Sequence, residues 1–153
     1  MNLQMEINSL KKLIAELEEQ AKEEQEFPQD GHWYWHITSD AGIGINSWEG
    51  GLEFEKEQLS IGNVFRTKDQ AEFEVEKLKV EAELRKFSRP FKEDDDNYYI
   101  EIYLPNKKLS IDRSEFFKTQ GTIYFESTTI ANEAIDAIGE NRIKKYLFGV
   151  EDL

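Results

Sequence analysis

The chain has 153 residues, no cysteine, and a formal net charge of −13 that arises from 19 basic and 32 acidic side chains. The lack of cysteine excludes disulfide bonds, thiolate metal sites and a cysteine nucleophile. Direct binding to a nucleic-acid backbone or to an anionic membrane depends on basic patches, so the charge argues against both. No segment has the apolar length of a signal sequence or a membrane span, and we therefore expect a cytoplasmic protein.

Apolar residues recur along residues 1–26 at alternating intervals of four and three, which is the spacing of a coiled-coil seam. These residues are Leu3, Ile7, Leu10, Ile14, Leu17 and Ala21. Isoleucine at a with leucine at d favours two parallel strands, in which Glu6 at g and Lys11 at e pair across the dimer. We predict a homodimer through this helix. A trimer, or a surface helix that packs on its own domain, are the alternatives.

Residues 32–88 predict a first unit of three strands and a helix. Residues 32–38 and 43–46 are rich in strand formers around a turn, and we expect the third strand at residues 63–65, with residues 52–58 as a candidate for an additional short strand. Thr67 is the expected N-cap of the helix, with Gln70 completing a capping box. The expected apolar face of this helix consists of Ala71, Val75, Leu78, Ala82 and Phe87.

Residues 97–150 predict a second unit with the same order. Strands are expected at residues 98–104, 108–112 and 121–126, followed by a helix that Ser127 caps. Its core face is expected to consist of Ile130, Ala131, Ala134, Ile135 and Ile138. A shift of 60 positions places Phe65 on Phe125, Thr67 on Ser127 and Ala71 on Ala131. The expected fold is therefore α+β: an N-terminal coiled-coil helix followed by two duplicated strand-strand-strand-helix units.

No motif in the sequence predicts a metal, a cofactor or a catalytic centre. His32 and His36 have no cysteine or third histidine to complete a zinc site. The acidic run at residues 93–96 lacks the alternating ligands and the turn glycine of a calcium loop, and we expect it to be an exposed linker. Glycine-rich phosphate loops and nucleophile elbows are absent from the sequence. We expect a protein that is not an enzyme, with a small carboxylate-dependent hydrolase as the alternative.

Acidic and aromatic side chains are the candidate contact residues for a partner protein. Four consecutive acids, Glu93, Asp94, Asp95 and Asp96, offer negative charge to a basic surface. Strand alternation sends Trp33 and Trp35 to one face and Tyr34 to the other, so one face is expected to expose an aromatic ring. Together with Trp48, these tryptophans are candidate anchors for an interface, and packing in the core is the alternative for each of them.

Two blocks of the sequence resemble a family of small proteins that phages, prophages and other mobile elements of Gram-positive bacteria encode. The blocks are IGNVFRTKDQAEFEVEKLKVEAEL, which begins at Ile61, and GTIYFESTTIANEAIDAIGENRIKKYLFGV, which begins at Gly121. The resemblance covers about residues 32–150 and implies an origin in a phage or mobile element and a place in the cytoplasm of a bacterial host. It implies no activity and no site residue.

These observations together favour an acidic interaction protein that is not an enzyme. The expected partner is a basic host protein such as a nucleic-acid-binding nuclease, and the sharpest form of the hypothesis is a DNA mimic that blocks a CRISPR effector or a restriction enzyme. The alternative is a structural or assembly accessory protein of a phage or mobile element, in which the coiled coil tethers the β-rich part.

Overall fold

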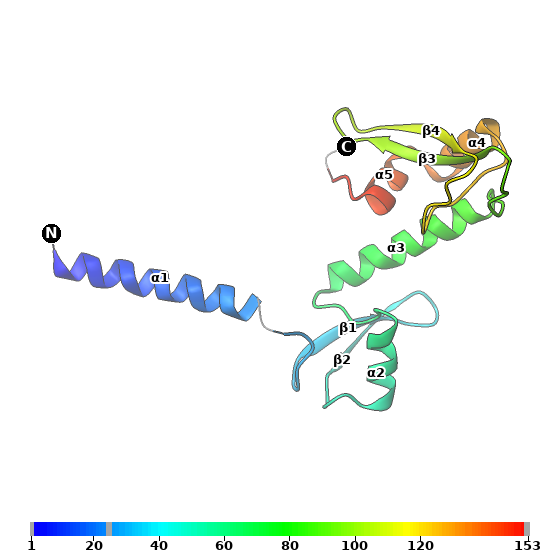
Figure 1. Ribbon diagram of the computed structural model, residues 1–153. Coiled ribbons are helices and arrows are strands. Elements are labelled where there is room, and N and C mark those ends of the chain that lie inside the picture. Colours follow the sequence, from blue (N-terminus) through cyan, green and yellow to red (C-terminus); the bar gives the residue numbers. More distant parts are fainter. Residues whose placement is uncertain (1, 24–25, 152–153) are drawn as a thin grey trace. The chain divides into compact units, whose positions relative to one another are not determined.

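The computed structural model describes residues 2–23 and 26–151, in which five helices and two small antiparallel sheets form an α+β protein (Figure 1). The α+β class that the sequence predicts is therefore confirmed. The chain divides into two units. Unit 1 consists of Met1–His36 and Gly44–Arg66, and unit 2 consists of Ile37–Ile43 and Thr67–Leu153. Each unit is described by itself.

The N-terminal helix α1 spans Leu3–Glu23, without a glycine or proline to interrupt it. Residues 1, 24 and 25 of the predicted coiled-coil segment lie outside the described residues. Every apolar seam residue is exposed, from Ile7 at 44% to Leu3 at 74%, and Ala21 is exposed as well. The helix is confirmed, and the apolar stripe along it is not covered within the chain.

Next along the chain come a hairpin and a short helix: β1 at Trp33–Ile37, β2 at Ile43–Ser47 and α2 at Glu53–Ser60. All of these residues except Ile37 and Ile43 belong to unit 1. Gly44 lets the imidazole of His36 lie against the backbone of β2, because a Cβ at this position would lie 2.5 Å from that ring. The strand predicted at residues 52–58 is wrong, since these residues belong mainly to α2. Apolar alternation covers only the start of that segment, and Glu, Lys and Gln, which dominate it, favour a helix.

The third strand predicted for each unit is reduced to a single bridge. Trp35 and Phe65 exchange two backbone hydrogen bonds of 2.9 and 2.8 Å, and Tyr98 and Phe125 exchange two of 3.2 and 2.8 Å. The rest of residues 63–65 and 121–126 does not form a strand. The duplicated three-strand units are therefore not confirmed: each sheet of the described residues has two strands and one bridge, and each bridge is followed by a capped helix.

The helix α3 spans Lys68–Arg85, and its N-cap Thr67 accepts a hydrogen bond of 3.2 Å from the backbone N–H of Gln70. The predicted face is correct at Ala71 and Val75, which are buried, but Leu78 is 46% exposed. Val80 and Leu84 are buried in its place. The buried side turns along the helix because its C-terminal half packs on α4 and α5.

Unit 2 contains a second hairpin, β3 at Asn97–Tyr103 and β4 at Lys108–Ser114, whose register pairs Asn97 with Ser114 and Tyr103 with Lys108. After it come α4 at Thr128–Ile138 and α5 at Glu140–Phe148. Ser127 caps α4 as predicted, with a hydrogen bond of 3.1 Å from the N–H of Ile130. The sequence did not predict α5 as a helix separate from α4. Gly139, which has a φ of 104°, lies between the two helices.

The core of unit 2 lies among α3, α4, α5 and the hairpin (Figure 1). Its buried members are Val80, Leu84, Phe125, Ala131, Ala134, Ile138 and Ile143. Ile100 and Ile111, which face each other across β3 and β4, pack against these residues from the sheet. Because a hairpin alone is marginal in water, this packing is what holds β3 and β4 in place. None of the helices in the described part of the chain is long and apolar enough to cross a bilayer.

Candidate protein-interaction site

The acidic loop, residues 93–96, lies directly before β3 in unit 2. Glu93, Asp94 and Asp95 are exposed and Asp96 is half-buried. Asp94 adopts a φ of 62°, in the left-handed region, so the loop turns sharply at this residue. The sequence predicts an exposed linker here, with acidic side chains that could contact a partner. The structure gives its backbone a defined conformation.

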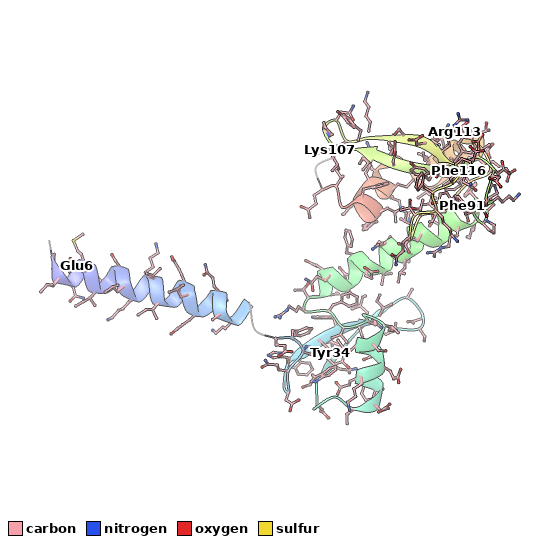
Figure 2. The ribbon with its side chains drawn as sticks, viewed as in Figure 1. Glu6, Tyr34, Phe91, Lys107, Arg113 and Phe116 are labelled. Carbon is pink, nitrogen blue, oxygen red and sulfur yellow. The ribbon has the colours of Figure 1, made fainter. Side chains whose placement is uncertain are left out.

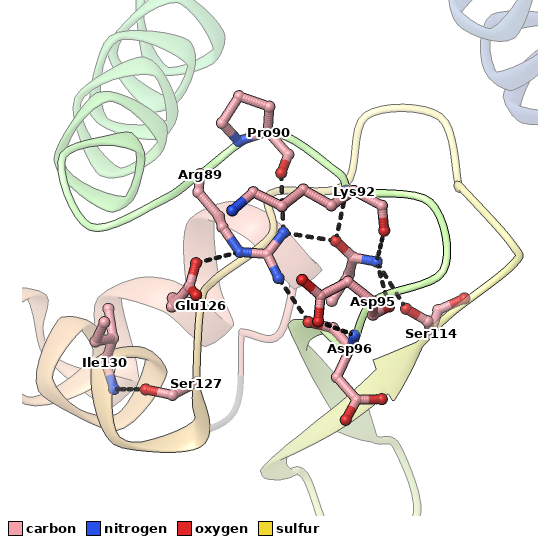
Figure 3. A network of polar contacts seen from close by, with 10 residues as sticks. Arg89, Pro90, Lys92, Asp95, Asp96, Ser114, Glu126, Ser127 and Ile130 are labelled. Carbon is pink, nitrogen blue, oxygen red and sulfur yellow. Dashed lines mark hydrogen bonds and ion pairs between the residues drawn. The ribbon is translucent and has the colours of Figure 1, made fainter.

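Asn97 fixes the acidic loop from inside and is itself fully buried. Its side-chain amide donates hydrogen bonds to the carbonyls of Lys92, Asp95 and Ser114, at 2.9, 2.9 and 3.0 Å (Figure 3). Its side-chain oxygen accepts a hydrogen bond of 2.8 Å from the N–H of Lys92. One buried side chain thus closes the loop and ties it to β4.

Arg89 provides the second anchor, from the segment that follows α3. Its guanidinium donates to the side-chain oxygen of Asn97 at 2.7 Å and to the carbonyls of Pro90 and Asp96 at 3.0 and 2.6 Å. It also forms an ion pair with Glu126, the residue before the α4 N-cap (Figure 3). The backbone carbonyl of Asp96 therefore turns toward the Arg89 cation, while three of the carboxylates of the loop remain exposed to solvent.

All four side chains of the acidic loop are negatively charged. Asp96 pairs with Arg113 of β4, whose guanidinium lies 3.3 Å from its carboxylate. That pair is exposed and contributes little to stability. Glu93, Asp94 and Asp95 have exposed side chains, and a fixed backbone reduces the conformational entropy lost when they bind a basic surface.

The three candidate tryptophans belong to unit 1 and differ in exposure. Trp33 is 64% exposed and Trp35 is half-buried beside its bridge to Phe65. Trp48 is only 7% exposed, and its ring meets the edge of Tyr34 at a centroid distance of 5.7 Å. Trp48 is thus a core residue, and of the three candidate tryptophans only Trp33 and Trp35 have surface that a partner could contact.

Sequence reasoning missed a buried polar cluster around Tyr34 in unit 1. The Tyr34 hydroxyl donates to Gln58 at 3.0 Å, and the fully buried Glu55 accepts hydrogen bonds from the N–H groups of Glu49 and Leu52, each at 3.1 Å. Burial raises the pKa of the Tyr34 phenol; a hydrogen bond with Asn46 partly offsets this, and Glu55 adds to it. The phenol therefore stays neutral at physiological pH, and the cluster is structural.

The two histidines do not form a joint site. His32 accepts a hydrogen bond of 3.0 Å from the N–H of Gln29 and stacks on Phe27, whereas His36 contacts Asn46 at 3.2 Å. Within residues 2–23 and 26–151, no group of three or more His, Cys, Asp or Glu side chains could hold a metal ion.

The geometry thus places the acidic loop on a fixed backbone in unit 2, an exposed tryptophan in unit 1, and an uncovered apolar stripe on α1. The sequence contains a signal for the fixed acidic loop, because an asparagine that ends a turn, here Asn97, commonly forms hydrogen bonds with nearby backbone groups. Comparison with protein-family models, curated proteins and solved structures finds no significant match for this chain.

Proposed function

We propose that this chain is an interaction protein without enzymatic activity, which acts in the cytoplasm of a bacterial host on behalf of a phage or mobile element. Its acidic surface occupies the basic, nucleic-acid-binding surface of a host defence enzyme, such as a CRISPR effector or a restriction enzyme. It needs no cofactor and does not bind nucleic acid itself.

The observation that carries this proposal is the acidic loop held by Asn97 and Arg89. A nucleic-acid channel recognises a regular array of negative charge through its lysines and arginines. Carboxylates on a fixed backbone imitate such an array better than carboxylates on a mobile linker, because less freedom is lost on binding. The net charge of −13 adds long-range attraction to a basic partner.

Self-association through α1 is the second part of the proposal. Seven large apolar residues of α1 are exposed by 44% or more. Five of them belong to the seam, Leu3, Ile7, Leu10, Ile14 and Leu17, and the other two are Met5 and Leu13. A helix with such a stripe is normally covered, and the heptad spacing fits a second copy of the same helix. A dimer would present two acidic loops to one partner.

The test of the proposal is inhibition of DNA cleavage by purified host restriction and CRISPR nucleases. The wild-type protein is expected to inhibit at least one of them. The variant E93Q/D94N/D95N, in which the loop loses three charges, is expected to inhibit more weakly. The control E57Q/E133Q/D136N loses the same charge at exposed positions of α2 and α4 and is expected to retain most inhibition. No inhibition of any nuclease, at low salt or physiological salt, would contradict the proposal.

An assembly accessory of a phage or mobile element is the second candidate. The exposed ring of Trp33 and the apolar stripe of α1 favour this role, since aromatic and apolar contacts dominate stable assemblies. Binding of that kind would change little with ionic strength, whereas binding by the acidic loop would weaken as salt rises.

We also infer that residues 32–88 and residues 97–150 descend from one duplicated element. Phe65 and Phe125 each make the bridge to a hairpin, and Thr67 and Ser127 each cap the following helix. Ala71 and Ala131, 60 positions apart like the other pairs, are both fully buried. These shared roles support the duplication that the sequence predicts, in a unit with two strands and one bridge.

A further inference from the structure

Two phenylalanines, Phe116 and Phe117, are exposed by 67% and 82% directly after β4. Exposed apolar patches with a polar rim often mark sites of protein–protein interaction. The segment that carries them is not loose. The Ser114 hydroxyl donates to the carbonyl of Phe117 at 2.6 Å and accepts from its N–H at 3.1 Å. The N–H of Thr119 donates to the hydroxyl of Tyr124, at 2.8 Å.

The strand register brings this pair to the end of the hairpin where the acidic loop lies. Asn97, which ends the loop, pairs with Ser114, and Arg113 contacts Asp96. Figure 2 shows Phe116 and Arg113 at this end of the hairpin and Lys107 at the other end. The two exposed rings and the exposed carboxylates of the acidic loop therefore lie in segments that flank the same end of the hairpin.

We propose that Phe116, Phe117 and the acidic loop form one binding surface for an arginine-rich segment of a basic partner protein. This inference rests on the proposed function and names the chemistry of its contact. A guanidinium can stack on an aromatic face and pair with a carboxylate at the same time, and it is more weakly hydrated than an ammonium group. Carboxylates alone attract lysine and arginine, whereas rings beside them favour arginine.

The other end of the same hairpin provides an internal comparison. Tyr103 and Leu104 are 61% and 63% exposed, similar to Phe116, but they lie beside Lys107 and Lys108, and Tyr103 pairs directly with Lys108. The lysines there disfavour a basic partner. At the proposed surface, in contrast, the acidic loop and Glu115 together outnumber the basic residues Lys92, Arg113 and Lys118. An exposed aromatic ring at that end is expected to contribute nothing to arginine binding.

The test compares the affinities of the full-length protein for fluorescent nona-arginine and nona-lysine, measured by anisotropy. The wild-type protein is expected to bind both peptides, with nona-arginine preferred. F116A/F117A is expected to lower that preference by about two- to five-fold, and the control Y103A/L104A is expected to leave it unchanged. F116L/F117L, which keeps apolar bulk without a π face, is expected to behave like the alanine variant, and F116Y/F117Y to keep the preference.

The results of this peptide-binding test distinguish failure of this inference from failure of the proposed function. An arginine preference that survives in both the alanine and the leucine variants would overturn this inference. The proposed function would still stand in that case if E93Q/D94N/D95N weakens the binding of both peptides. If the wild-type protein binds neither peptide, both this inference and the proposed function are overturned. A changed molecular mass of F116A/F117A in solution would show that the phenylalanines join copies of this chain, which also overturns the inference.

Discussion

At the scale of single residues, the side chain of Asn97 fixes the backbone of the acidic loop through several hydrogen bonds. Its buried amide contacts four backbone groups, in residues 92, 95 and 114, and the guanidinium of Arg89. Without this side chain, several buried donors and acceptors would lack partners, and each such group is costly to leave unpaired.

We expect Asn97→Ala to lower the free energy of unfolding by about 2–3 kcal/mol. The matched control is Asn106→Ala, because Asn106 is exposed and accepts a single hydrogen bond, of 3.1 Å, from the N–H of Lys108. That change is expected to cost about 0.5 kcal/mol. Urea denaturation of the three proteins measures the difference. Equal losses for the two variants would show that Asn97 does not organise the loop.

At the scale of elements, features determined by neighbouring residues were predictable and features determined by distant ones were not. Thr67 and Ser127 cap α3 and α4 as expected, since an N-cap depends on the next three residues. In contrast, the anchor Arg89 acts through Asn97 and Glu126, which no local pattern connects. The acidic loop was therefore found in the sequence as a charge run, but its fixed backbone was not.

The errors in the predicted helices and strands also arise from contacts that the local sequence pattern does not show. The segment that forms α2 alternates like a strand only at its start, and the buried Glu55, which accepts from the N–H groups of Glu49 and Leu52, holds the helix start in place. A buried carboxylate cannot be distinguished from an exposed one by sequence position. The predicted face of α3 failed at Leu78 because the partners of its C-terminal half, α4 and α5, come from a distant part of the chain.

The helix α1 yields a prediction about oligomeric state. In the proposed parallel dimer, Ile14→Asp places a charge without a partner in the apolar seam, where burying it is strongly unfavourable. The control Ala15→Asp introduces the same charge one position outside the seam. By light scattering, the wild-type protein and the control are expected to have twice the chain mass of 18.0 kDa, and Ile14→Asp to have the mass of a single chain. The same mass for wild type and Ile14→Asp would contradict the coiled-coil assignment.

At the scale of the whole molecule, negative charge exceeds positive charge by 13. Such an excess acts at long range, and its effect depends on ionic strength, because the Debye length falls from roughly 30 Å at 0.01 M salt to roughly 8 Å at 0.15 M. In the proposed function, the fixed carboxylates of the acidic loop would give this diffuse attraction a specific place of contact. Both properties are required of a protein that competes with DNA for a basic channel.

The most direct measurement is the affinity of the wild-type protein for a nuclease that it inhibits, determined across this range of salt with and without duplex DNA as a competitor. Our account predicts that affinity falls steeply as salt rises, that DNA displaces the protein, and that E93Q/D94N/D95N shows a shallower dependence on salt than E57Q/E133Q/D136N. An affinity that salt and DNA leave unchanged would contradict the account and would favour an assembly role.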